Sequence, residues 1–368
     1  MIQKTVAVIF GGRSGEHVVS LRSAASIMDA IDSEKYKIIP VGISREGLWY
    51  SGSDIWQAFW EYRLPVNAAK TVLLTDPSQP GLLIQSEKSP VEWNYQPLDI
   101  VFPILHGTYG EDGTIQGLFE MAGIPYVGSG VLASSVSMDK VVMKILFERA
   151  GLPVASYVYF HRHEWVQDRS SWQDTIIKQL ELPCFVKPAN LGSSVGITKV
   201  SSLDELGAAV EEAFLYDEKV IVDKFIDGRE IECSVLGDLD VQASRPGEII
   251  PCNEFYDYRA KYIDDRSELI VPVELSLDIE EKVRNYSIKA FQVVEGSGLA
   301  RVDFFIERVS GRVIVNEINT MPGFTSISMY PKLWEASGIS YPELVNRLLD
   351  IAESRFIRRK SLMVAPPE

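Results

Sequence analysis

Cysteine is scarce in this chain of 368 residues, which contains only three. Cys184, Cys233 and Cys252 lie far apart and form no C-x-x-C pair. An odd number of cysteines at such spacings predicts neither a disulfide framework nor a zinc site. Reduced cysteines are typical of a reducing compartment, so we expect a cytoplasmic protein.

Long hydrophobic runs and an excess of positive charge are also missing. The apolar run at residues 6–10 ends at Gly11-Gly12-Arg13. It is too short for the core of a signal peptide or for the ~20 residues of a membrane span. Acidic residues outnumber basic ones, 51 to 36, for a net charge of -15. Such a surface repels phosphate backbones and anionic lipids, so we expect neither nucleic acid nor a membrane as a partner.

The first part of the chain shows an α/β pattern. A β-branched run at residues 5–10 ends in two glycines and precedes helical apolar spacing over residues 14–31, which predicts a strand, a tight turn and a helix. Residues 36–43 and 100–105 indicate further buried strands, each followed by a loop and a helix. We therefore expect a small doubly wound parallel sheet. Residues 50–95 are less regular and receive no assignment.

The rest of the chain combines helices with short strands. The spacing predicts a helix over residues 138–150 with Val142, Ile145 and Leu146 on one face and Gly151 as its C-terminal cap. Glycine-containing turns separate several short apolar runs, which favours antiparallel sheets. The expected strands are residues 185–187, 196–200, 220–225, 230–236, 300–307 and 312–319, and the expected helices are residues 203–214, 279–294 and 341–356.

Three oxygen-bearing side chains converge on the last predicted strand pair. Glu317 and Asn319 are two residues apart on one strand and share a face with Asp303 on its partner. Magnesium takes oxygen ligands and usually retains substrate phosphates, so this set indicates a nucleotide–magnesium site. Arg301 lies on the same side, where its charge can neutralise a transferring phosphoryl group. The alternative is a solvated strand face with paired charges.

Small-residue loops follow two other strands. Lys187 precedes the loop 192–196, whose backbone N–H groups can approach phosphates, although a plain turn between strands explains the glycines equally well. Lys140, at a helix start, fits a plain solvated side chain.

His106 follows a buried strand at the end where doubly wound sheets bind ligands. Glu16 follows a glycine-rich turn that does not match the nicotinamide fingerprint, and it either binds a ligand or complements a helix dipole.

Taken together, these segments resemble the D-alanine–D-alanine ligase family of the ATP-grasp superfamily, from residue 6 to about residue 352. The resemblance depends on a combination of motifs and not on any one of them. The motifs are G-G-R-S-G-E-H, H-G-T-Y-G-E-D-G-T-I-Q-G, V-K-P-A-N-L-G-S-S-V-G, F-Y-D-Y-R-A-K-Y, R-V-D-F and N-E-I-N-T-M-P-G-F-T-S.

The resemblance implies a fold and a division into domains. The expected fold is an N-terminal doubly wound parallel sheet (pre-ATP-grasp) followed by a two-lobed ATP-grasp fold with mainly antiparallel sheets. Residues 1–135 would bind the first substrate and form a homodimer, and residues 136–226 would form the central lobe. Residues 227–368 would carry the metal and second-substrate sites, with residues 251–272 as a lid, which the length and mixed composition of that segment also favour.

The resemblance also implies an activity. It is the ATP-dependent ligation of two D-alanine molecules to D-alanyl-D-alanine through an acylphosphate, with release of ADP and phosphate, for peptidoglycan precursor synthesis. Tyr262 is the residue typical of dipeptide-forming members, as opposed to those that form D-alanyl-D-lactate. The expected cofactors are ATP and two Mg²⁺ or Mn²⁺ ions per site.

Site roles follow by resemblance at matching positions. Nucleotide contacts are expected from Lys140, Lys187, Ser194, Asp223, Lys224, Phe225, Ile226, Glu230 and Lys261. Catalytic or substrate contacts are expected from Glu16, His106, Ser193, Tyr262, Arg301, Gly323, Ser328 and Met329. Metal ligands are expected to be Asp303, Glu317 and Asn319.

Two positions depart from the family pattern: Val18 replaces an expected glutamate, and Asp223 stands where glutamate is common. The second departure puts a side-chain contact to adenine in doubt. Two rival interpretations remain at this point. One is a non-enzymatic nucleotide-binding protein on the same fold. The other is an ATP-grasp ligase that acts on bicarbonate or larger acids, which the set Glu16, Ser193 and Tyr262 disfavours.

Overall fold

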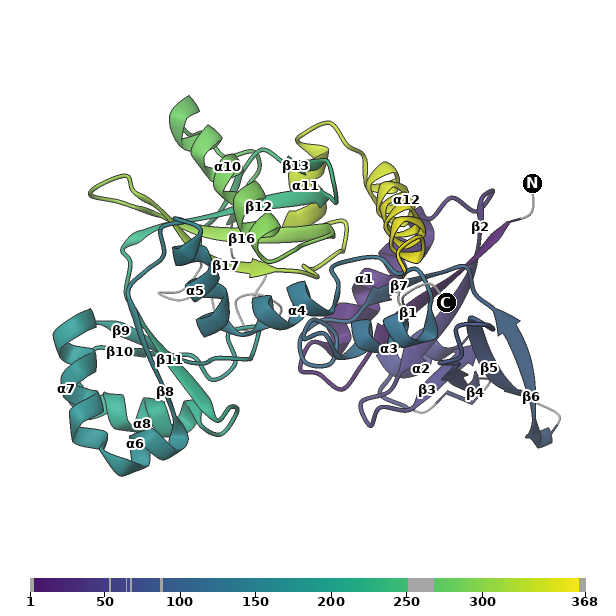
Figure 1. Ribbon diagram of the computed structural model, residues 1–368, viewed down its shortest axis with the longest axis horizontal. Helices are drawn as coiled ribbons and strands as arrows, with labels where there is room; N and C mark the ends of the chain where they lie inside the picture. Colours follow the sequence, from purple (N-terminus) through teal and green to yellow (C-terminus); the bar gives the residue numbers. More distant parts are fainter. Residues whose placement is uncertain are drawn as a thin grey trace.

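The computed structural model describes residues 3–52, 54–63, 65–66, 68–86, 89–250 and 268–363. Their strands form three sheets, each with helices packed beside it (Figure 1). None of the helices in these ranges is long and apolar enough to cross a bilayer. Most of the predicted lid, including Lys261 and Tyr262, lies outside the described residues.

The first sheet has the strand order β6-β5-β4-β3-β2-β1-β7. Strand β1 pairs in parallel with β2 and β7, and from Val6 onward it is fully buried, as expected for a parallel strand covered on both faces. The segment left unassigned in the sequence adds antiparallel strands to this α/β core. The strands are β1 (Lys4–Gly11), β2 (Tyr36–Ile43), β3 (Trp49–Gly52), β4 (Ala68–Leu73), β5 (Gly81–Ser86), β6 (Ser89–Pro97) and β7 (Ile100–Ile104). The helices before residue 140 are α1 (His17–Ala30), α2 (Ile55–Trp60), α3 (Thr114–Ala122) and α4 (Val131–Met138).

The other two sheets are antiparallel, as the short strands with glycine turns predict. The second has the order β10-β9-β11-β8, and the third has the order β15-β14-β12-β16-β17 with β13 paired to β12. The second sheet and its helices comprise β8 (Tyr157–His161), α6 (Arg162–Gln167), α7 (Arg169–Leu180), β9 (Cys184–Pro188), β10 (Thr198–Val200), α8 (Leu203–Ala213) and β11 (Lys219–Lys224). The third comprises β12 (Gly228–Gly237), β13 (Val241–Ala243), β14 (Gly247–Ile250), β15 (Glu268–Ile270), α10 (Leu277–Val293), β16 (Gly298–Glu307), β17 (Val313–Asn319) and α11 (Met329–Glu335). Strand β15 falls within the segment predicted as a lid.

Helix α5 (Lys140–Arg149) lies between the second and third sheets (Figure 1). On the apolar face that the spacing predicts, Val142 and Ile145 are 36% and 44% exposed. The buried face carries two lysines, Lys140 and Lys144, that have partners inside the protein. Hydrophobic spacing alone places lysines in the solvent. It therefore does not predict that this face of α5 is buried.

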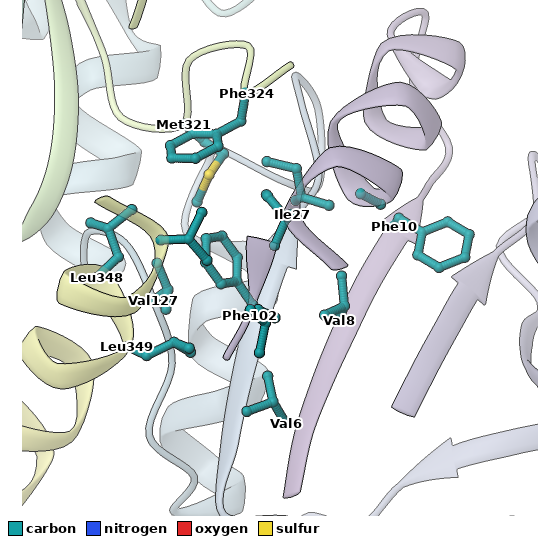
Figure 2. Packing of buried hydrophobic residues seen from close by; sticks show 14 of the residues in the cluster. Val6, Val8, Phe10, Ile27, Phe102, Val127, Met321, Phe324, Leu348 and Leu349 are labelled. Atoms are coloured by element: carbon teal, nitrogen blue, oxygen red, sulfur yellow. The ribbon is translucent and has the colours of Figure 1, made fainter. Parts of the chain in front are cut away.

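One core cluster joins the two ends of the chain. Leu348 and Leu349 of α12 (Tyr341–Lys360) are fully buried against residues of β1 and β7 and against Met321 and Phe324, which follow β17 (Figure 2). The loop after β17 is thereby held against the loops that follow β1 and β7. This packing brings together the segments that carry the predicted site.

Candidate active site

A cleft of about 490 Å³ opens where the first and third sheets meet the loop that follows β9. Its walls come from the start of α1, the loop after β7, the start of α5 and the loop after β17. Among the residues that line it are eleven of the predicted site residues, which are Glu16, His106, Lys140, Ser193, Ser194, Arg301, Glu317, Asn319, Gly323, Ser328 and Met329. Segments separated by more than 300 residues, from Glu16 to Met329, thus contribute to a single cavity.

The predicted metal ligands lie on neighbouring strands. Asp303 pairs with Glu317 across β16 and β17, and the Asn319 amide nitrogen donates to Asp303 Oδ2 at 3.0 Å. The strand pattern in the sequence predicts this convergence, and the pairing of the two strands confirms it. The role of the three residues as metal ligands stays a prediction.

Arg301 lies at the centre of this acidic set. Its Nε and Nη2 atoms each donate to Asp303 at 2.7 Å, and Nε lies 3.0 Å from Glu232 Oε2. Burial alone would lower the pKa of Arg301, but the charges of Asp303, Glu232 and Glu317 raise it well above its ordinary value. Three carboxylates around one guanidinium leave two negative charges.

That surplus charge fits a divalent cation. Carboxylate and amide oxygens are the donors that magnesium prefers. No cluster of three His, Cys, Asp or Glu side chains in the described ranges is arranged to hold a metal. The predicted oxygen ligands for a cation here are Asp303, Glu317 and the amide oxygen of Asn319.

Glu16 and Glu111 form a carboxylate pair at the opposite wall of the cleft. A Cβ atom added to Gly107 would lie 2.9 Å from Glu16 Oε2, and Glu111 Oε2 accepts from the Gly107 backbone at 3.1 Å. Burial first, and the charge of Glu16 second, raise the pKa of Glu111 well above its ordinary value. Two carboxylates close enough to interact electrostatically favour a bound ammonium group. The sequence reasoning missed Glu111, although it lies in the T-Y-G-E-D-G motif.

The raised pKa of Glu111 predicts a pH-dependent gain of stability in Glu111→Gln. Because the folded state favours the protonated carboxyl, the wild-type protein loses stability as the pH rises through the raised pKa. Glutamine is neutral throughout. The melting midpoint of the variant should exceed that of the wild type at pH 8, and the difference should shrink toward pH 4. The exposed Glu92→Gln serves as the control, and equal midpoints at both pH values would contradict the assignment.

His106 connects two walls of the cleft. Its Nδ1 lies 2.9 Å from the Met321 carbonyl oxygen, and its Nε2 lies 3.3 Å from Ser23 Oγ. Burial lowers its pKa, so the ring is neutral near pH 7, with Nδ1–H as the donor and Nε2 as the acceptor. The histidine therefore holds the loop after β7 against the loop after β17.

The loop after β9 has a constrained backbone. Ser193 and Ser194 have φ angles of 53° and 58°, a left-handed conformation that non-glycine residues rarely adopt. Such strain is concentrated at ligand-binding sites. Lys140 donates to the Leu191 carbonyl oxygen at 2.5 Å and is only 8% exposed, which excludes the alternative of a solvated side chain.

Lys187, on the strand before this loop, forms an ion pair with Asp223 that the sequence does not predict. Asp223 accepts from Lys187 through Oδ2 at 2.8 Å and from Lys144 through Oδ1 at 2.6 Å. Burial raises the pKa of Asp223, but the two ammonium groups outweigh it and lower the value to about 2. Burial lowers the pKa of Lys187, and Asp223 reverses this to a net increase, whereas for Lys144 burial prevails and its pKa is lowered. Asp223 is thus occupied by lysines, and Lys144 was not predicted.

The remaining predicted residues lie around this group. Glu230 pairs with Ile249 on β12 and β14, and the Phe225 ring lies 6.1 Å from the Phe185 ring in a tilted arrangement. The Lys224 side chain donates to Glu181 at 2.9 Å, and its backbone pairs with Cys184 on β9. Ser328 Oγ lies 2.7 Å from Thr325 Oγ1. A Cβ on Gly323 would come within 3.2 Å of the same Ser328 oxygen, so Gly323 and Ser328 form one corner of the cleft.

Comparisons with known proteins agree with this geometry. Two family models match, described as D-ala D-ala ligase N-terminus over residues 5–129 and D-ala D-ala ligase C-terminus over residues 146–350. The D-alanine--D-alanine ligase of Heliobacterium modesticaldum is 50% identical over 97% of this chain and 96% of that protein. The D-alanine--D-alanine ligase of Acetivibrio thermocellus is also 50% identical, over 96% of this chain and 97% of that protein.

Solved structures show the same similarity. The VanG D-Ala:D-Ser ligase from Enterococcus faecalis aligns with a TM-score of 0.85 at 37% identity, over 95% of this chain and all of that one. The D-alanine-D-alanine ligase from Coxiella burnetii aligns with a TM-score of 0.83 at 36% identity, over 97% of this chain and 96% of that one. The fold is therefore that of the ATP-grasp enzymes. The chain belongs to the D-alanine–D-alanine ligase family.

Proposed function

We propose that this chain joins two D-alanine molecules into D-alanyl-D-alanine at the cost of ATP, for the synthesis of peptidoglycan precursors. The observation that carries the proposal is the composition of the cleft. One cavity combines the Glu16–Glu111 carboxylate pair, Lys140, Arg301, and Glu317 with Asn319 at the end of β17. A module that only bound a nucleotide would not need this complete set.

The first half of the reaction needs an aligned nucleophile. Glu16 receives the ammonium group of the first D-alanine, while Lys140 and Lys187 neutralise the phosphates of ATP. The substrate carboxylate then attacks the γ-phosphorus, and the bond to ADP breaks, which gives an acylphosphate. Two magnesium or manganese ions, held by Asp303, Glu317 and Asn319, would supply further neutralisation of phosphate charge.

The second half joins the two amino acids. Ser328 and the Met329 backbone hold the carboxylate of the second D-alanine, whose neutral amine attacks the acyl carbon. A tetrahedral oxyanion forms, and Arg301 and the Gly323 N–H stabilise it before phosphate leaves. Ser193 and Tyr262 are proposed to connect Glu16 to the lid, and Ser194, Asp223, Lys224, Phe225, Ile226, Glu230 and Lys261 to surround the nucleotide.

We also infer the setting of the enzyme. The domain division at residues 135 and 226, a cytoplasmic location and a homodimer formed by the first domain are supported by the family relationship. The dipeptide product is supported by Tyr262, which lies outside the described residues.

An assay of phosphate release tests the function directly. Purified protein with Mg–ATP should release phosphate with D-alanine and not with L-alanine or bicarbonate, and mass spectrometry should identify D-alanyl-D-alanine. D-serine and D-lactate are added as competitors because one similar structure is a D-Ala:D-Ser ligase. A mixed dipeptide or depsipeptide as the main product at neutral pH would overturn the assigned second substrate, and release with bicarbonate alone would overturn the reaction class.

A further inference from the structure

Three charged side chains are buried together between α5 and the second sheet. Asp223 on β11 bonds Lys187 on β9 and Lys144 on α5, and the side chains of Asp223 and Lys144 are only 5% and 2% exposed. Lys187 is the most accessible of the three, at 13%. Each lysine occupies a different carboxylate oxygen, so the two contacts are independent.

The position of Lys144 is fixed by its surroundings. It lies one helical turn after Lys140, on the buried face of α5, and its Nζ is 5.2 Å from the centre of the Tyr157 ring. Glu317 is a further acidic neighbour of both lysines, and Glu230 acts on Lys187 in addition. Lys187 is also the lysine on β9, the strand that leads into the loop 192–196.

This arrangement creates a conflict for Lys187. A buried carboxylate that loses its last counterion is strongly destabilised. If Lys187 were the sole partner of Asp223, its transfer to an ATP phosphate would leave such a carboxylate behind. Because Lys144 also bonds Asp223, the carboxylate keeps one ammonium partner even when Lys187 moves to a phosphate.

We propose that Lys144 is a positioning residue for nucleotide binding: it remains on Asp223 as a resident counterion and thereby releases Lys187 to the phosphates of ATP. The proposal rests on the proposed function, because it takes Lys187 as a phosphate ligand. A lysine that served only to hold α5 against the second sheet would affect stability and leave nucleotide affinity unchanged.

Calorimetric titration of the full chain with Mg–ATP, without D-alanine, tests the role. Lys144→Met should weaken ATP binding at least tenfold, because Asp223 then holds Lys187. The double variant Lys144→Met/Asp223→Asn should recover most of that affinity, since no carboxylate remains to hold Lys187. Adenosine, which has no phosphates, should bind Lys144→Met within about twofold of the wild type. Arg149→Met, at an exposed position of the same helix, is the matched control and should bind ATP normally.

The outcomes separate the two proposals. Unchanged ATP affinity in folded Lys144→Met, or no recovery in the double variant, overturns the positioning role. Wild-type protein that binds no Mg–ATP overturns the proposed function itself. If Lys144→Met does not fold, Lys144→Arg and the double variant decide the matter, because both avoid an isolated buried carboxylate. Lys144→Arg and the double variant should each bind ATP within about threefold of the wild type. A tenfold loss of ATP affinity in both of these proteins would contradict the role.

Discussion

Replacement of Asp303 by alanine is expected to lower the ligation rate at least a thousandfold while the protein remains folded. The carboxylate lies opposite Glu317 and bonds both Arg301 and Asn319. On the proposed function, its removal takes away a predicted metal ligand and misplaces the Arg301 guanidinium proposed to stabilise the oxyanion. Loss of such charge stabilisation costs about 4 kcal/mol or more, and each 1.36 kcal/mol is about tenfold in rate. The rate of phosphate release under saturating ATP and D-alanine measures the effect.

A surface variant provides the comparison for Asp303→Ala. Asp227 also carries an arginine partner, Arg308, but its side chain is 66% exposed and lies outside the cleft. Asp227→Ala should retain the full rate, because exposed ion pairs contribute about 1 kcal/mol at most to stability and nothing to the chemistry here. Circular dichroism and melting curves establish that both variants are folded. A folded Asp303→Ala protein with near-normal turnover would reject the metal assignment.

The sequence predicts the strand pair of Asp303 and Glu317 well because its evidence is local. Alternating residues on two adjacent runs, joined by a glycine turn, determine both the pairing and the shared face. The parallel core of the first sheet is predicted for a similar reason, since a fully apolar run such as residues 6–10 indicates a strand buried on both faces. Element type and approximate position follow from patterns of this length.

Contacts between distant segments leave no such pattern. The buried face of α5 depends on Asp223, which lies 79 residues away from Lys144 and turns an apparently solvent-directed lysine inward. Glu111 resembles any loop carboxylate until the fold brings Glu16 near it. The antiparallel strands β3 to β6 contain too many short, irregular runs to be ordered without their partners. These features are set by tertiary charge pairing and packing, which one sequence does not display.

Arg355 is expected to make a large polar contribution to the attachment of α12. It is 8% exposed, donates to the carbonyl oxygens of Gly128 and Tyr126, and stacks over the Tyr126 ring at 4.6 Å. Arg355→Met would keep the length of the side chain but leave two buried carbonyl groups without their donor. Each carbonyl group left without a donor costs about 1–3 kcal/mol. The free energy of unfolding should therefore fall by roughly 3 kcal/mol.

Thermal melting measures this loss, and Arg347→Met on the same helix is the matched control. Arg347 is 43% exposed and pairs only with Glu343, one turn earlier, so its replacement should change stability by less than about 0.5 kcal/mol. We expect the midpoint of Arg355→Met to fall by about 5 °C or more. Because α12 packs in the same cluster as Met321 and Phe324, hydrogen exchange should also increase in residues 319–325 of the Arg355 variant and not of the control. Equal midpoints for the two variants would show that apolar packing alone, through Leu348 and Leu349, holds the end of the chain against the first sheet.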